Sequence, residues 1–206
     1  MKKGFTLLEL LIVIAILAIL ASTAVVVLNP AEILRKSRDS SRLQDLDSMR
    51  TALNYYIANT STPVLGSQPT IGCMDQTVAP CTAGCTYSHL TGVFSGSTVS
   101  SASTTRTVGG AGWIPVALSS LTGGSPLSSW PVDPTNSSTS ARYYAYQCNY
   151  ANTTFTLYAN MESATYKNGG SSDVESKDGG SIAAVYEVGT AFLTAATGTN
   201  FFNDAN

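Results

Sequence analysis

The sequence predicts an α+β fold in which one long N-terminal helix packs against a small antiparallel sheet. Residues 5–28 are almost continuously apolar, and residues 29–59 continue with apolar side chains at helical spacing. Short β-prone segments with alternating hydrophobicity occur only in the last third of the chain. We therefore expect an apolar helix over 5–28 that protrudes, an amphipathic continuation over 29–59, and a globular head over 60–206.

Composition suits an extracellular surface. Of the 206 residues only 12% are charged, the formal net charge is −2, and Ser, Thr, Gly and Asn fill much of the later part. No cluster of Lys and Arg with interleaved aromatic residues occurs, so the sequence predicts no sequence-specific binding to nucleic acid.

The apolar segment is long enough to cross a membrane. From Leu10 to Leu28 it spans about 28 Å as a helix, close to the thickness of the hydrocarbon core. Lys2 and Lys3 precede it, which places the N-terminus in the cytoplasm and the head outside. A secretory signal peptide or an ordinary membrane anchor would leave Glu9 without a partner in the bilayer, where charged groups are costly.

The residues around Glu9 form a recognisable motif. The stretch Gly4-Phe5-Thr6-Leu7-Leu8-Glu9, after a short basic start, resembles the processing site of type IV pilins and type II secretion pseudopilins. The resemblance implies a pilin-like fold, with residues 1–4 as a leader peptide. It also implies that a prepilin peptidase cleaves between Gly4 and Phe5 and that the new Phe5 amine is N-methylated.

The resemblance gives Glu9 a role in assembly. In the family, this glutamate pairs with the N-terminal amine of a neighbouring subunit, here Phe5, as subunits form a helical homo-oligomeric filament. Such a pair attracts strongly in a low dielectric, and a carboxylate without it would be stranded in an apolar bundle. The alternative is a glutamate that reaches the membrane boundary. An assembly platform and its ATPase are partners implied by the family.

Pro30 predicts a break in the helix. The helix either kinks there or starts afresh with Pro30 in its first turn. The resemblance favours a continuous but locally bent or melted helix, in which any melting rests on Pro30 alone. Beyond it, an apolar stripe is expected to pack against the head, and the helix is expected to end near Asn59, about 80 Å from its start. The stripe consists of Leu43, Leu46, Met49, Leu53, Tyr56 and Ile57.

The head is expected to contain three strands, at residues 143–148, 154–161 and 182–188. Residues 95–107 and 167–180 read as exposed loops, and residues 113–118 as an apolar patch that covers the sheet or the helix. The stretch Trp130-Pro131-Val132-Asp133-Pro134 resembles a turn found before the sheet in pseudopilins and related pilins.

The four cysteines, Cys73, Cys81, Cys85 and Cys148, predict two disulfides in an extracytoplasmic head. Zinc is disfavoured because no paired CxxC arrangement is present. Three connectivities are possible. Pairing of neighbours, Cys73 with Cys81 and Cys85 with Cys148, is slightly preferred.

No enzymatic motif is present, so we expect no catalytic residues and no enzyme. The single histidine, His89, lies in a Thr/Ser/Gly-rich region typical of a surface. Asp173, Glu175 and Asp178 offer hard oxygen ligands that could bind calcium, although a solvated acidic loop explains them more simply. No other cofactor is predicted.

These features predict a pilin that waits in the cytoplasmic membrane and then enters an extracellular type IV pilus, which serves attachment, twitching motility or DNA uptake. The nearest alternative is a pseudopilin of a type II secretion system, favoured by the Trp130–Pro134 stretch and the acidic loop. A third possibility, from another functional class, is a minor pilin that acts as a binding module.

Overall fold

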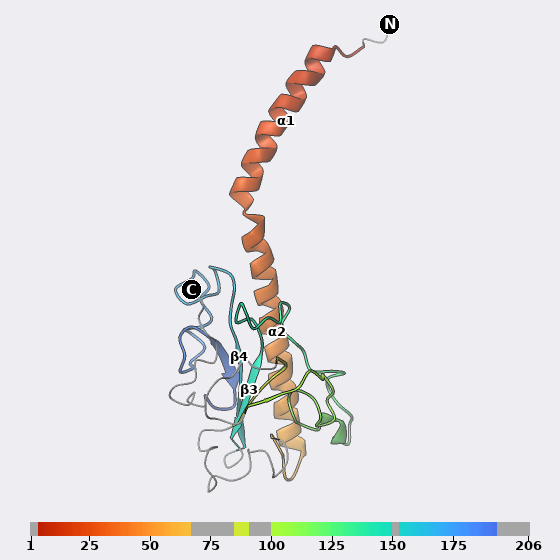
Figure 1. Cartoon of the computed structure of the whole chain (residues 1–206), viewed down its shortest axis with the longest axis vertical. Coiled ribbons are helices and arrows are strands. Elements are labelled where there is room, and N and C mark those ends of the chain that lie inside the picture. Colours follow the sequence, from red (N-terminus) through yellow and green to blue (C-terminus); the bar gives the residue numbers. More distant parts are fainter. Residues whose placement is uncertain (1–3, 67–84, 91–99, 150–152, 193–206) are drawn as a thin grey trace.

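The computed structural model describes residues 4–66, 85–90, 100–149 and 153–192 and shows a bent helical rod that carries a head at one end (Figure 1). The rod consists of helices α1 (Leu7–Leu28) and α2 (Pro30–Asn59). Helix α1 projects beyond the head, whereas α2 runs along it. The predicted α+β architecture, with a protruding apolar helix and a second half packed on a sheet, is confirmed.

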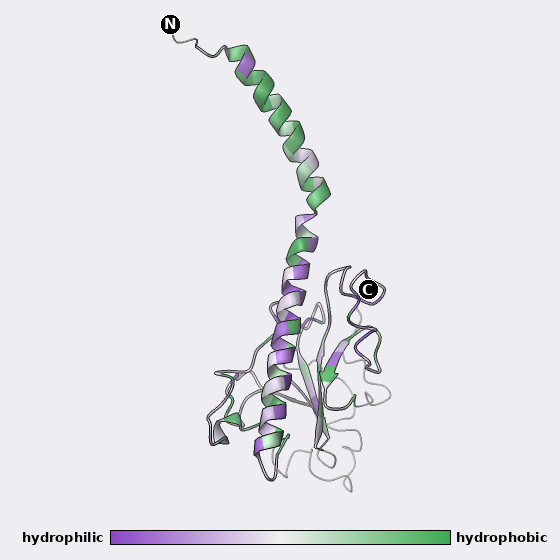
Figure 2. Cartoon of the chain, turned by 180° about the vertical axis from the view of Figure 1, so that it is seen from behind, coloured by the Kyte–Doolittle hydropathy of each residue, from purple (hydrophilic) through white to green (hydrophobic). Residues whose placement is uncertain are grey.

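Helix α1 is apolar on all sides (Figure 2), and all its described side chains are exposed. Its segment Leu7–Val25 is long and apolar enough to cross a membrane. The hydroxyls of Ser22 and Thr23 donate hydrogen bonds to the carbonyls of Ile19 and Leu20, at 2.8 and 2.9 Å. Their polarity is therefore satisfied within the helix, which suits an apolar environment.

The break between the helices lies at Asn29. This residue adopts the left-handed conformation, with φ 41° and ψ 71°, and caps the end of α1. It also caps the start of α2, because its side-chain oxygen accepts from the Glu32 N–H at 3.4 Å. Pro30 occupies the first turn of α2, where its missing N–H has no intrahelical partner to lose. The expectation of a continuous helix broken by Pro30 alone is therefore wrong, and the alternative of a fresh start is right.

The buried face of α2 follows the predicted stripe and extends it. Leu46, Met49, Leu53 and Tyr56 are buried as expected, together with Ala52. The same face continues toward the N-terminus with two charged residues, Asp39 and Arg42, which are also fully buried. Charged side chains on a helix usually lie on its solvated surface, so their burial here requires partners in the head.

In the described ranges of the chain the sheet has five strands, in the order β2-β1-β3-β4-β5. The strands are β1 (Cys85–Ser88), β2 (Ser100–Ala102), β3 (Ala145–Asn149), β4 (Thr154–Ala159) and β5 (Tyr186–Gly189). Strands β1, β3, β4 and β5 pair antiparallel, and β2 adds to β1 in parallel at the edge.

Two expectations about the sheet need correction. Part of the predicted loop over 95–107 forms the edge strand β2, whereas residues 95–99 lie outside the described part. The third predicted strand starts four residues late, because residues 182–185 form a turn closed by a hydrogen bond from the Val185 N–H to the Ile182 carbonyl, at 3.2 Å. The local sequence pattern does not reveal that a polar stretch adds an edge strand, or that the first residues of an alternating stretch form a turn.

The sheet buries both faces. One face packs on α2 and on residues 113–118, where Trp113, Ile114 and Leu118 are buried, as the apolar patch predicted. The other face carries a smaller cluster that includes Tyr143, Tyr158 and Val185. Strand β4 is accordingly buried on both sides rather than on one.

The described residues include two of the four cysteines. Cys73 and Cys81 lie outside the described residues, whereas Cys85 and Cys148 are direct partners across strands β1 and β3. Directly opposed residues in an antiparallel pair lie about 4.5–5.5 Å apart at Cα, within the range that a disulfide spans. The backbone register is therefore compatible with a Cys85–Cys148 bridge, and the disulfides stay predictions.

The packing of α2 gives a first test. Leu53 is fully buried and Leu34, on the same helix, is 60% exposed. We expect Leu53→Ala to lower the free energy of unfolding of the head by roughly 2–5 kcal/mol, because it opens a cavity. The matched change Leu34→Ala should cost less than about 0.5 kcal/mol. Denaturant unfolding of the full chain in detergent, followed by tryptophan fluorescence, measures both; equal losses would contradict the packing described.

Candidate functional site

The predicted cleavage site is open. Gly4, Phe5 and Thr6 precede the first helical turn and are exposed, Phe5 at 80%. A side chain at Gly4 would meet nothing within 4 Å. The Gly4–Phe5 peptide bond therefore lies in an exposed, non-helical stretch, which is accessible to a peptidase.

Glu9 is held by a capping box at the start of α1. Its carboxylate accepts hydrogen bonds from the Thr6 N–H, at 2.9 Å, and from the Thr6 hydroxyl, at 2.8 Å. In return, the Thr6 hydroxyl oxygen accepts from the Glu9 N–H at 3.2 Å. This reciprocal arrangement satisfies two backbone donors that a helix start otherwise leaves without partners.

The capping box fixes the position of the Glu9 carboxylate in a single subunit. It bonds to Thr6 of its own chain, next to Phe5, whose nitrogen cleavage would turn into an amine. Sequence reasoning singled out Glu9 and missed Thr6 as its partner. The signal was present, because a threonine three residues before a glutamate at the head of an apolar run is the capping-box pattern.

A second site ties α2 to the head, an ion network of Asp39, Arg42, Asp133 and Glu162. The Arg42 guanidinium donates through Nε to Asp133 Oδ2 at 2.6 Å and through Nη2 to Asp133 Oδ1 at 2.9 Å. It also donates through Nη1 to Asp39 Oδ1 at 2.7 Å. The side chains of Arg42, Asp39 and Asp133 are fully buried, so this guanidinium is bound in the bidentate manner that suits arginine.

The network also orders the chain after strand β4. Asp39 accepts from the backbone N–H groups of Glu162 and Ser163, at 2.9 and 2.7 Å. Glu162 in turn accepts from both Arg38 and Arg42. One turn of α2 therefore positions the Asp133 segment and the segment after β4 together.

Sequence analysis missed this network, although two signals pointed to it. Asp39 and Arg42 continue the spacing of three and four residues that leads into the buried Leu46 and Met49. The Trp130–Pro134 stretch was also noted, and its Trp130 and Asp133 are buried. Nothing in the local pattern identifies Asp133 as the partner of Arg42.

The network shifts the titration of Glu162. Partial burial opposes ionisation of Glu162, but hydrogen bonds from Arg38 and Arg42 outweigh it and lower its pKa from 4.5 to about 2. Burial opposes the charge of the Arg42 guanidinium, but hydrogen bonds to Asp133 above all, and to Glu162 and Asp39, raise its pKa. Glu162 and Arg42 are therefore both charged at neutral pH.

The three acids proposed as calcium ligands do not converge. Asp173 accepts from the N–H groups of Gly169 and Ser176, and hydrogen bonds with Ser176 lower its pKa to about 2. Glu175 accepts from the N–H groups of Met161 and Asn168.

Asp178 bonds to other groups again, the N–H groups of Gly180 and Glu187. Among the described residues no group of three or more His, Cys, Asp or Glu side chains is placed to hold a metal ion. The three carboxylates stabilise a folded loop through these hydrogen bonds, and in this arrangement they do not fit one shared ion. Asp173 and Glu175 are buried within the loop. The stretch over 167–180 is thus more ordered than the exposed loop expected. Calcium binding itself stays a prediction.

His89 has a structural position. Its Nε2 lies 3.0 Å from the Thr104 carbonyl oxygen and its Nδ1 lies 3.1 Å from Asn136 Nδ2. The ring bridges β1 and two connecting segments of the head. No nucleophile is hydrogen-bonded to it within the described residues, and nothing in this geometry points to catalysis.

Comparison with known proteins bears on the first site. Residues 1–25 match the model of the prokaryotic N-terminal methylation motif. The chain therefore carries the prepilin-type signature of type IV pilins and pseudopilins, which implies processing by a prepilin peptidase and assembly into pilus-type filaments. No curated protein and no solved structure matches the chain.

The ion network gives a stability prediction. Asp133→Asn removes the bidentate partner of a buried guanidinium, so we expect the free energy of unfolding to fall by roughly 3–5 kcal/mol. Asp47→Asn breaks an exposed pair with Arg50 on the same helix and should cost less than about 1 kcal/mol. Denaturant unfolding of both variants measures the difference, and a cost for Asp133→Asn as small as that for Asp47→Asn would refute the assigned role.

A pH prediction follows from Glu162. Its folded pKa of about 2 lies below the ordinary 4.5, so its charged form stabilises the head fully above about pH 4.5, and this contribution disappears as pH falls toward 2. Wild type should therefore be more stable than Glu162→Gln near neutral pH, and this advantage should shrink in that acid window. Unfolding free energies of the pair between about pH 6 and about pH 2 test it; a constant difference would count against the charge effect.

Proposed function

We propose that the chain is the structural subunit of a type IV pilus filament. The observation that carries the proposal is helix α1, which follows the methylation motif and finds no cover on its own head. A helix of this kind needs lipid or other helices around it.

The energetic argument is direct. Fourteen large apolar side chains of α1 are exposed. At about 1.5–3 kcal/mol for each buried aliphatic side chain, moving this helix from lipid into water would cost tens of kcal/mol. A subunit that leaves the membrane must therefore deliver α1 directly into a bundle of identical helices. Contacts of the heterologous, non-closing kind extend such a bundle into a fibre.

In this proposal, Glu9 determines how neighbouring subunits are aligned along the filament axis. It is the only ionisable residue of α1. In the bundle its carboxylate pairs with the Phe5 amine of a neighbouring subunit, which sets axial register as well as adding attraction. Before assembly the Thr6 hydroxyl and N–H keep the carboxylate hydrogen-bonded, so that the subunit does not carry an unsatisfied acid in the bilayer.

The proposal includes a topology and a sequence of events. Lys2 and Lys3 keep the N-terminus in the cytoplasm, where the peptidase removes residues 1–4 and Phe5 is methylated. The head and C-terminus lie outside. An assembly ATPase acting through a membrane platform then moves subunits from the cytoplasmic membrane into the extracellular filament.

A pseudopilin of type II secretion is the second candidate, since the Trp130–Pro134 stretch resembles a turn of that family. That stretch places Asp133 on Arg42, a role that a head of either kind could use. The acidic loop, which also pointed to a pseudopilin, uses its carboxylates on backbone N–H groups. Neither feature therefore favours the pseudopilin over the pilin. A minor pilin that binds DNA or surfaces has no specific support in the described residues.

The assembly role of Glu9 is tested by Glu9→Gln, which removes the charge and keeps the size. We expect processing and membrane insertion as in wild type, with filament yield reduced at least about tenfold, because one charge of a buried pair loses its partner. Asp47→Asn, which removes an exposed carboxylate from α2, should leave the yield unchanged.

The readout is electron microscopy of sheared surface fibres, with mass spectrometry of their main component. The proposal requires that this component begin at methylated Phe5. Fibres that lack this chain, or normal fibres from Glu9→Gln, would rule out the proposed role.

A further inference from the structure

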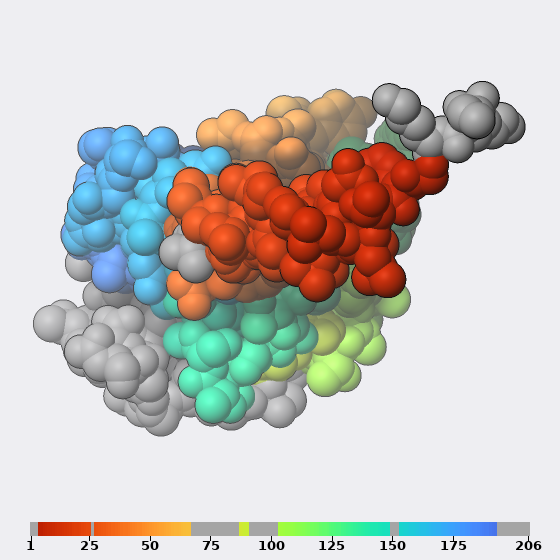
Figure 3. Space-filling model, turned by 90° about the horizontal axis from the view of Figure 1, so that it is seen from above, coloured from red at the N-terminus to blue at the C-terminus, as the bar shows by residue number. Residues whose placement is uncertain are grey.

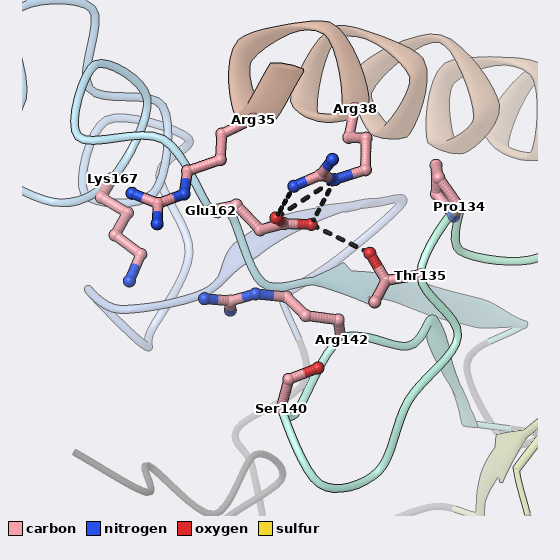
Figure 4. Close-up of a pocket in the computed structure, with 8 residues that line it drawn as sticks. All are labelled: Arg35, Arg38, Pro134, Thr135, Ser140, Arg142, Glu162 and Lys167. Carbon is pink, nitrogen blue, oxygen red and sulfur yellow. Dashed lines mark hydrogen bonds and ion pairs between the residues drawn. The ribbon is translucent and has the colours of Figure 1, made fainter. Parts of the chain in front are cut away.

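A cavity of about 680 Å³ lies where the first turns of α2 meet the head (Figure 4). Arg35 and Arg38 contribute from α2, Arg142 from the segment before β3, and Lys167 from the loop after β4. Among the described residues that line it, Glu162 is the only carboxylate. The walls thus present four cations and one anion.

The Glu162 carboxylate is already engaged. It accepts hydrogen bonds from Arg38, Arg42 and Thr135. By contrast, neither the Arg142 guanidinium nor the Lys167 ammonium has a hydrogen bond or ion pair within the described part of the chain, and Arg35 has only a 3.7 Å pair with Glu32. Figure 4 shows the three side chains converging on the side of Glu162 that faces away from Thr135.

The other carboxylates nearby are turned to other partners. Asp39 and Asp133 bind Arg42, and Glu175 accepts from backbone N–H groups. Burial and the positive charge of Arg42 lower the pKa of Arg142, against the opposite effect of the carboxylates of Glu162, Asp39 and Glu175. An anion that entered the cavity would meet cations whose charge is only partly compensated.

Arg142 and Lys167 stand on ordered backbone. Ser137 and Arg142 exchange two hydrogen bonds, from each N–H to the other carbonyl, at 2.8 and 2.9 Å. The Lys167 N–H donates to the Ser163 carbonyl at 3.1 Å, and Asp39 holds the Ser163 N–H at 2.7 Å. Hydrogen bonds therefore hold the backbone that carries both cations in place. This limits the conformational entropy that the protein would lose when a ligand binds.

The cavity lies at the end of the head from which α1 emerges. Arg35 follows Leu28, the last residue of α1, by seven positions, or about 10 Å of helix. Figure 3 looks along the molecule from the α1 side, and both the segment before β3 and the loop after β4 reach the surface at this end, next to the helix. The polar layer outside the hydrocarbon core is roughly 5–7 Å thick on each side, and long Arg and Lys side chains reach back toward it.

From this geometry we propose that the cavity binds the phosphate group of an anionic membrane lipid while the subunit waits in the bilayer. The proposal rests on the membrane-anchored pilin proposed above. Arg35, Arg142 and Lys167 would donate charge-assisted hydrogen bonds to the phosphate oxygens. The bound lipid would hold the head against the outer leaflet and would be released when the subunit enters the filament.

The test uses the full chain in a nonionic detergent and native mass spectrometry to count retained ligands. The probes are dioleoylphosphatidylglycerol, dioleoylphosphatidylcholine and inorganic phosphate. We expect one phosphatidylglycerol bound at least about tenfold more tightly than phosphatidylcholine or free phosphate, since charge-assisted hydrogen bonds contribute about that much. Arg142→Gln and Lys167→Gln should each weaken phosphatidylglycerol about five- to tenfold.

Lys177→Gln is the matched control, because Lys177 is an exposed lysine of the same head that does not line the cavity. It should leave the affinity unchanged. Tryptophan fluorescence melting shows whether each variant is folded, and Lys167→Gln carries the test if Arg142→Gln is not.

Several outcomes would overturn the proposal. Equal binding of the two lipids would exclude selectivity for a lipid of net negative charge, because both carry a phosphate. Free phosphate binding as well as phosphatidylglycerol would exclude the lipid. An equal loss in Lys177→Gln would show only general charge attraction. Variants that lose filaments but keep lipid affinity would make the cavity a contact between subunits. The lipid measurement is independent of the Glu9 experiment, so failure of one is distinguishable from failure of the other.

Discussion

The buried guanidinium of Arg42 is the interaction on which the shape of the molecule depends. It brings Asp39 of its own helix, Asp133 before β3 and Glu162 after β4 to one point. Because an uncompensated charge there would be costly, the three carboxylates must arrive together. The helix, the approach to the sheet and the loop that follows β4 thereby become one rigid unit.

The two helices of the rod differ in whether their apolar side chains are covered by the head. Helix α2 buries a stripe of aliphatic side chains against the sheet, whereas α1 leaves its apolar surface uncovered. Asn29 separates them with a left-handed conformation that serves as the cap of both helices. The rod bends along its length, and α1 and α2 run in different directions (Figure 1). The capping box at Thr6 then completes the free end of α1 and keeps Glu9 satisfied.

Several acidic residues of this protein accept hydrogen bonds from backbone N–H groups and thereby fix the path of the chain. Asp173, Glu175 and Asp178 each accept N–H groups of the loop after β4, and Asp39 does the same for the residues before that loop. As a result, Lys167 and Arg142 face the cavity beside Glu162 with little negative charge opposite them. The positive character of this cavity follows from how the carboxylates are used elsewhere.

The sequence by itself determined the processing motif, the apolar helix, the stripe on α2 and the approximate positions of β3 and β4. Each depends on a local pattern: a short motif, a period of 3.6 or a period of 2. Even the capping box was readable, since Thr6 and Glu9 are three residues apart.

Only the tertiary structure decided that Arg42 and Asp39 are buried, that β2 completes the sheet edge, and that four cations share one cavity. Arg42 lies 91 residues from Asp133 and 120 from Glu162. A charged residue on a helix is solvated or buried according to whether the fold supplies its counter-charges, and that information is not contained in its neighbours along the chain.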